Sequence, residues 1–194
     1  MKTKKSSAKK KGAKGAPRAS FREFRQFRGA FHPLPKINIG ITESHRARLG
    51  EGLAILLANT YVLYIKTQNF HWNVTGPFFQ TLHQTFEKQY QDLAEANDML
   101  AERIRSLGFP AIASCTQFKR LSSVGESIGI PGAADMVEEL VLGNETVVRT
   151  ARHLVDLAAK AHDHATADLI TQRLEIHEKA NWMLRSLFEP LRTP

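Results

Sequence analysis

The chain has 194 residues, 42% of them hydrophobic and 24% charged, which is enough for one sizeable domain with a real core. Its net charge of +8 is uneven, because residues 1–28 hold seven Lys, four Arg and one Glu and carry +10, which leaves −2 for the rest. The single cysteine, Cys115, excludes an internal disulfide or a thiolate metal cluster and is typical of a reducing cytosol. No apolar run is long enough to span a membrane, and the basic start lacks the apolar core of a secretory signal.

Residues 1–41 are expected to form a basic, largely disordered tail. The first twenty are mostly Lys, Ser, Ala and Gly and offer too little apolar surface to fold. A flexible polycation neutralises phosphates without reading sequence, so we expect sequence-independent DNA binding. The residues expected to contact DNA are Lys2, Lys4, Lys5, Lys9, Lys10, Lys11, Lys14 and Arg18. Phe and Arg interleave between Phe21 and Phe31, so a tail that is only solubilising, or is attracted to an anionic membrane, stays open as an alternative.

Residues 42–190 have the apolar spacing of helices throughout, without the alternation typical of strands. Thr42 is the expected cap of a first helix, which the Gly76–Pro77 pair ends. Three further helices are expected at about residues 79–107, 133–161 and 166–188, the last ending before Pro190. Residues 109–131 form a long connection with one short helical turn. This pattern predicts an all-α four-helix bundle with a long crossing between its second and third helices.

Two pairs of potential metal ligands lie on the second helix. His83 and Glu87 are four residues apart, as are Asp98 and Glu102, so the members of each pair face the same way. His71 ends the preceding helix and can reach the neighbourhood of His83. Glu87 and Asp98 are eleven positions apart, about 16 Å of helix, whereas dinuclear sites hold their ions only about 3.5–4 Å apart. One helix cannot close such a site, but two antiparallel copies around a twofold axis can.

The sequence therefore predicts two symmetric sites per dimer, each assembled from two subunits. One subunit supplies His71, His83 and Glu87, and its mate supplies Asp98 and Glu102. Two imidazoles with three carboxylates suit Fe(II), with Zn(II) or Mn(II) as competitors. No histidine follows a Glu by three residues, which disfavours the metal centre that ordinary ferritins hold inside one bundle. The stripe is also consistent with an ordinary wet dimer interface, because such polar pairs are common on solvated helix faces.

Several motifs resemble the Dps, or mini-ferritin, family. The resemblance covers roughly residues 42–188. The motifs are Asn69-Phe-His-Trp-Asn-Val, Gly76-Pro-Phe-Phe, Leu82-His, Asp98-x-x-x-Glu102-Arg103, Thr166-Ala-Asp-Leu-Ile and Trp182. The intervals of twelve, four, eleven and four residues between the five ligand candidates all match the family pattern. The resemblance implies a hollow homo-dodecamer in the cytoplasm, associated with the nucleoid, that oxidises Fe(II), usually with hydrogen peroxide in preference to oxygen, and stores ferric iron.

Carried over by position, the ferroxidase ligands are His71, His83, Glu87, Asp98 and Glu102. The family often has Asp in place of Glu87. The longer Glu side chain can still bind iron but is expected to alter the occupancy of the second iron position. Trp72 lies beside the site, as an electron donor or as a packing residue.

Asp163 and Asp168 match acidic residues that line iron-entry pores in the family. Alternatively, both simply favour the N-terminus of the fourth helix. A different overall function also stays open, that of a DNA-compaction protein whose metal site is structural.

Overall fold

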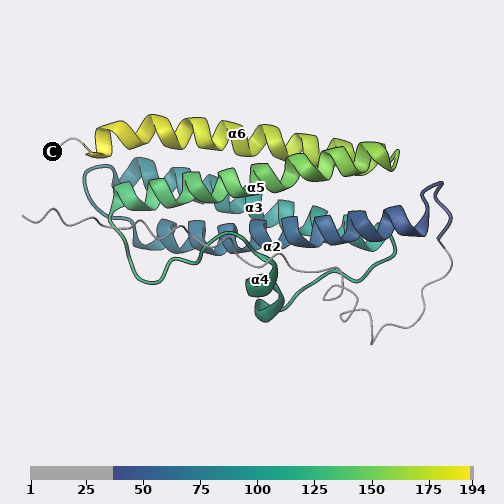
Figure 1. Cartoon of the computed structure of the whole chain (residues 1–194). Coiled ribbons are helices and arrows are strands. Elements are labelled where there is room, and N and C mark those ends of the chain that lie inside the picture. The colour runs from purple at the N-terminus through teal and green to yellow at the C-terminus, as the bar shows by residue number, and fades with distance from the viewer. Residues whose placement is uncertain (1–36, 193–194) are drawn as a thin grey trace, which may run out of the picture.

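The computed structural model describes residues 37–192, which contain five helices and no strand (Figure 1). The helices are α2 (Glu43–Asn73), α3 (Phe79–Ser106), α4 (Cys115–Leu121), α5 (Ala133–Lys160) and α6 (His164–Arg192). The predicted all-α class is confirmed. The eight basic residues expected to contact DNA, and the rest of the predicted tail before residue 37, lie outside the described residues. None of the helices in residues 37–192 is both long and apolar enough to cross a bilayer.

The helix bounds follow the sequence signals closely, with one error. Thr42 caps α2 as expected, its hydroxyl oxygen accepting a hydrogen bond from the backbone of His45 at 3.3 Å. The expected helical turn in the long connection is α4, which begins with a capping box at Ser114. The prediction that the last helix ends before Pro190 is wrong, because α6 continues to Arg192. A proline this near the end removes only one late backbone hydrogen bond.

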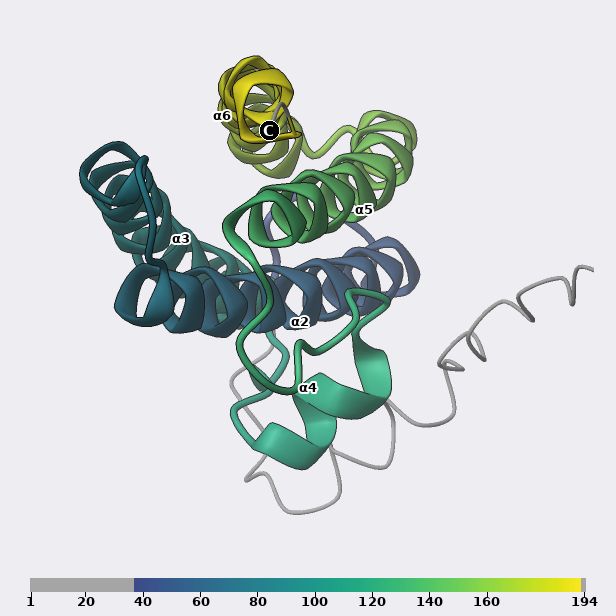
Figure 2. The same cartoon turned by 90° about the vertical axis from the view of Figure 1, so that its left-hand side faces the viewer.

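The four long helices lie side by side as a bundle, and α4 sits outside it against α2 (Figures 1 and 2). α2 packs along both α3 and α5, while α6 packs along α5. The crossing connection is fastened to α2 by Asn59, whose side-chain oxygen accepts a hydrogen bond from the backbone of Ser123 at 2.7 Å. The crossing connection joins two helix pairs, α2 with α3 and α5 with α6. One long side of α3 faces away from the other helices (Figure 2).

Two glycines explain how α2 and α5 approach so closely. A Cβ added at Gly52 would lie 2.7 Å from a methyl carbon of Leu154, and one at Gly143 would lie 2.7 Å from a methyl carbon of Leu63. Glycine inside a helix costs about 1 kcal/mol relative to alanine. Here the cost is offset by burial, because Leu63 is fully buried and Leu154 nearly so.

A polar cluster lies in the middle of the bundle. The ring of His177 donates through Nδ1 to the side-chain oxygen of Asn144 at 2.7 Å. Arg173 grips the Asp92 carboxylate with two hydrogen bonds of 2.9 and 2.6 Å and lies 3.4 Å from the other ring nitrogen of His177. Burial, and then the Arg173 charge, lower the pKa of His177 to about 3, although Asp92 acts in the opposite sense. This histidine is therefore a neutral structural residue.

Replacing His177 with glutamine should make the fold less sensitive to acid. The unfolded chain binds a proton at His177 near pH 6.5 and the folded chain does not, so this residue lowers the free energy of unfolding by about 1.4 kcal/mol per pH unit as the pH falls from about 6.5 towards 3. Urea unfolding at a series of pH values measures that slope. His153→Gln, at an exposed histidine, is the matched control and should keep the wild-type slope. Equal slopes in the wild type and the His177 variant would contradict the assignment.

Candidate metal site

The end of α2 and the start of α3 are joined by a pair of histidines. The rings of His71 and His83 stack with their centroids 3.9 Å apart and an interplanar angle of 21°. Nδ1 of His71 lies 2.9 Å from the carbonyl oxygen of His83, and Nδ1 of His83 lies 2.9 Å from the carbonyl oxygen of His71. The sequence predicted that His71 reaches the neighbourhood of His83, and the structure brings the two together.

These reciprocal hydrogen bonds fix which nitrogen of each ring is free. A carbonyl oxygen only accepts, so each Nδ1 must carry the proton that it donates. In the neutral ring the lone pair then belongs to Nε2, which is the usual arrangement of a metal-binding histidine whose other nitrogen is held by the backbone. His71 is only 7% exposed and His83 is half-buried. The pair therefore offers two oriented nitrogen ligands from a rigid corner.

The three carboxylates are distributed along α3 as the spacing predicted. Glu87 is half-buried and lies one turn beyond His83, whereas Asp98 and Glu102 are exposed near the other end of the helix. None of the three carboxylates makes a hydrogen bond or ion pair with another residue of the described chain. No group of three or more His, Cys, Asp or Glu side chains in residues 37–192 is close enough to hold a metal ion. The structure thus joins the histidines but keeps Asp98 and Glu102 apart from them.

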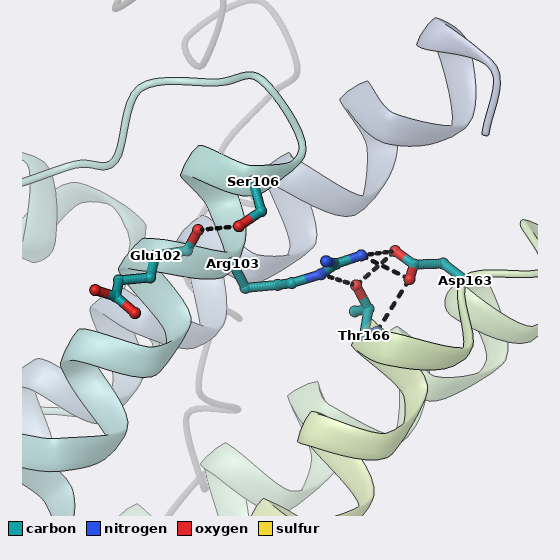
Figure 3. Close-up of polar contacts among 5 residues, drawn as sticks. All are labelled: Glu102, Arg103, Ser106, Asp163 and Thr166. Atoms are coloured by element: carbon teal, nitrogen blue, oxygen red, sulfur yellow. Dashed lines mark hydrogen bonds and ion pairs between the residues drawn. The ribbon is translucent and has the colours of Figure 1, made fainter. Parts of the chain in front are cut away.

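Arg103 fixes the direction in which Glu102 points. Figure 3 shows the Arg103 side chain reaching α6 while Glu102 projects to the opposite side of α3. Arg103 donates to both carboxylate oxygens of Asp163, at 2.7 and 2.8 Å, and to the hydroxyl of Thr166 at 2.8 Å. Successive residues of a helix point about 100° apart. With Arg103 anchored against α6, its neighbour Glu102 is held outward.

Asp163 is also the cap of α6. Its carboxylate accepts hydrogen bonds from the backbone and hydroxyl of Thr166, at 3.0 and 2.6 Å. Burial by itself raises the pKa of Asp163, but the hydrogen bonds from Arg103 and Thr166 and the charge of Arg103 outweigh it and hold this pKa below its usual value. Asp163 is only 2% exposed.

Asp163 thus fills the alternative role at the N-terminus of α6, while its place in an iron-entry pore stays a prediction. Asp168 is exposed, and among the described residues it accepts a hydrogen bond from Gln172 alone, so its pore role also stays a prediction.

Two aromatic residues lie beside the histidines. Trp72 is 67% exposed and projects from the end of α2, so within this subunit it does not pack in the core. Tyr90 meets the ring of His71 edge-on, with centroids 5.1 Å apart. No sequence motif pointed to Tyr90 as a functional residue. A signal was present, because Tyr90 follows His83 by seven residues and Glu87 by three and so lies on the same helix face.

Comparisons with known proteins show the family of this chain. A family model of the ferritin-like domain matches residues 51–193, so the chain is a ferritin-like protein. A DNA protection during starvation protein of Brevibacillus brevis is 40% identical over 141 residues, which are 71% of this chain and 95% of that protein. An uncharacterised low temperature-induced protein of Nostoc is 41% identical over 158 residues, 80% of this chain and 88% of that protein.

Solved structures lead to the same family. A Dps protein of Bacillus brevis superposes with a TM-score of 0.72 at 38% identity, over 74% of this chain and 97% of the other. A Dps protein of Vibrio cholerae, described as a member of a broad superfamily of ferritin-like diiron-carboxylate proteins, gives a TM-score of 0.76 at 29% identity over 81% and 99% of the two chains. This chain belongs to the Dps, or mini-ferritin, family.

Replacing Asp163 with asparagine should cost about 3 kcal/mol of folding stability, because it leaves the largely buried Arg103 charge without its partner. Since the pKa of Asp163 is lowered, this contribution is present above the usual carboxyl pKa and is lost as the pH falls through the lowered value. Denaturant unfolding at neutral pH measures the loss. Glu178→Gln, which breaks the exposed Arg152–Glu178 pair, is the control and should cost less than about 1 kcal/mol. Equal losses in both variants would contradict the anchoring role.

Proposed function

We propose that this protein is a mini-ferritin that oxidises Fe(II) at sites shared between two subunits, stores the ferric iron inside a hollow homo-dodecamer, and binds and protects DNA through its Lys-rich tail. Each site takes His71, His83 and Glu87 from one subunit and Asp98 and Glu102 from its mate. Its place is the cytoplasm, in association with the nucleoid. The Brevibacillus relative is named for DNA protection, and the Vibrio structure is described as a diiron-carboxylate protein, which supports both halves of the proposal.

The observation that carries this proposal is the pair of histidines with both Nε2 atoms free, separated along α3 from two carboxylates that have no partner among the described residues. Asp98 lies eleven positions after Glu87, about 16 Å along the helix. A twofold axis across α3 would bring the histidine corner of one subunit to the carboxylates of the other. Such a site contains nitrogen and oxygen ligands only, which suits Fe(II) and admits Zn(II) or Mn(II) as competitors.

Iron is the substrate of this reaction. Two Fe(II) ions held together deliver one electron each, and one hydrogen peroxide molecule with two protons is thereby reduced to two water molecules while two Fe(III) form. Taking both electrons at one place avoids the one-electron reduction of peroxide that releases hydroxyl radical. Oxygen is the slower alternative oxidant. The chain contributes by holding the ions, since each imidazole keeps its Nε2 atom available while its Nδ1 is bound to a backbone carbonyl oxygen.

The tail is the natural source of DNA affinity. Residues 1–28 carry +10 and the other 166 residues carry −2, so the body of the protein has no net positive charge that would attract phosphates. Twelve tails on one shell would act together, which turns weak individual contacts into tight and cooperative binding.

A mixing experiment tests whether the site is shared between subunits. The variants His83→Ala and Asp98→Ala should each lack rapid Fe(II) oxidation by peroxide, measured by stopped-flow ferric absorbance. When the two are unfolded together, refolded and reassembled, half of the dimers pair one chain of each kind, and each such dimer regains one intact site of two. The mixture should therefore recover about a quarter of the wild-type amplitude.

The control for this experiment is the same two variants assembled separately and then combined without subunit exchange, which should stay inactive. No recovery after true co-assembly would contradict the shared site. If His83→Ala oxidises iron as fast as the wild type, the site is structural, and the DNA-compaction alternative replaces the ferroxidase.

Removing residues 1–20 should abolish DNA binding and spare iron oxidation. The deletion takes away all eight basic residues predicted to contact phosphates. Gel retardation of plasmid at several salt concentrations measures binding, and the wild-type shift should weaken steeply as salt rises. A tail of equal length with the eight residues changed to glutamine separates charge from length. A truncated protein that retards plasmid as well as the wild type would rule out the tail as the DNA-binding element.

A further inference from the structure

The three tyrosines of the sequence form one continuous line of ring contacts that ends at the histidine corner. Tyr90 on α3 meets His71 with ring centroids 5.1 Å apart, and it also meets Tyr64 on α2 with centroids 6.3 Å apart. Tyr64 meets Tyr61, one turn earlier on α2, at 5.8 Å. Tyr61 stacks on Phe118 of α4 at 4.1 Å and an angle of 15°. The line therefore runs from the candidate iron site along α2 to the short outer helix.

Packing alone does not account for tyrosine at these three positions. None of the three hydroxyl groups makes a hydrogen bond with the described part of the chain, so phenylalanine would fill the same space. The chain uses phenylalanine at another contact between α2 and α3, where Phe70 and Phe86 are fully buried. None of the three phenol oxygens is a buried atom without a partner, so within this subunit each reaches solvent. A phenol whose oxygen reaches water can release its proton when the ring is oxidised.

We propose that Tyr90, Tyr64 and Tyr61 form an electron relay that supplies the second electron when a site holds only one Fe(II), and that moves the resulting oxidising equivalent away from the iron. This inference rests on the proposed ferroxidase function. Phenol is one of the two side-chain groups most readily oxidised by one electron, the other being indole. Tyr90 is the electron donor because its ring contacts the candidate ligand His71. Tyr64 and Tyr61 then share the electron vacancy that oxidation leaves on Tyr90.

The relay conserves atoms, charge and electrons. One Fe(II), one tyrosine and one proton react with one hydrogen peroxide to give Fe(III), a neutral tyrosyl radical and two water molecules, the phenol proton being used in forming water. The radical at Tyr90 then takes a hydrogen atom's worth of electron and proton from Tyr64, and Tyr64 in turn from Tyr61. A later Fe(II) and a proton restore the tyrosine and give a second Fe(III). The sum is the same two-iron reduction of peroxide, so no hydroxyl radical leaves the site.

The test uses the full-length assembled protein, loaded with one Fe(II) per site, mixed with peroxide and frozen within milliseconds for electron paramagnetic resonance. The wild type should show a tyrosyl radical. Tyr90→Phe keeps the packing, removes the hydroxyl and should lose most of that signal. Tyr61→Phe is the matched control, because it makes the same change at the far end of the line. The Tyr61→Phe variant should form the radical at the wild-type yield. The radical should have a shorter lifetime, because only two tyrosines remain to share it.

A second measurement separates failure of the relay from failure of the function. With two Fe(II) per site, all three proteins should oxidise iron at the same rate, because both electrons then come from iron. If the wild type does not oxidise iron, the proposed function fails. If it does, the relay alone is overturned by any of three results: no tyrosyl signal in the wild type, an undiminished signal in Tyr90→Phe, or a tryptophanyl signal from Trp72 in its place. Spin trapping should detect more hydroxyl radical from Tyr90→Phe at one Fe(II) per site.

Discussion

The length of a helix is the constraint on which the proposed chemistry depends. α3 is a continuous helix of 28 residues, and its two groups of candidate ligands lie at fixed separation along it. A rise of about 1.5 Å per residue keeps Glu87 and Asp98 about 16 Å apart whatever their side chains do. Within the described residues no other acid or histidine completes either group. Under the proposed function, each subunit carries two incomplete halves of a site, and the iron chemistry becomes a property of the assembled protein.

At both ends of α3, candidate ligands are held in place within the subunit, and by different contacts. At one end of α3, two reciprocal hydrogen bonds fasten the histidine rings across the turn from α2. At the other end, Arg103 is gripped by Asp163 and Thr166 of the α5–α6 corner, which holds Glu102 outward (Figure 3). Functional groups held by packing and by a second layer of hydrogen bonds lose little entropy on binding. The three candidate carboxylates of α3, by contrast, have no partner among residues 37–192, and a bound cation would compensate their charge.

The inside of the bundle shows the opposite arrangement. His177, Asn144 and Asp92 lie together at mid-bundle, which is where a ferritin-like bundle can hold metal. Here Asn144 and Arg173 occupy both ring nitrogens of His177, and the Arg173 guanidinium binds the Asp92 carboxylate. The Arg173 guanidinium thus repels a cation and occupies the oxygen and nitrogen atoms that would bind one. The polar groups of these two places thus differ in one respect. Both ring nitrogens of His177 and the Asp92 carboxylate have partners within the described chain, whereas the Nε2 atoms of His71 and His83 and the three candidate carboxylates of α3 have none there.

The sequence by itself determined whatever depends on a single helix. Periodicity and capping residues gave the four long helices, the spacing of His83, Glu87, Asp98 and Glu102 placed them on α3, and only the end of α6 beyond Pro190 was misjudged. Tertiary structure alone decided which nitrogen of His71 is free, that Asp163 binds Arg103 sixty residues away, and that Tyr90 meets Tyr64. The physical reason is range. Helix geometry repeats from residue to residue and can be counted along the chain, whereas contacts between helices depend on how far each is turned and shifted against its neighbour.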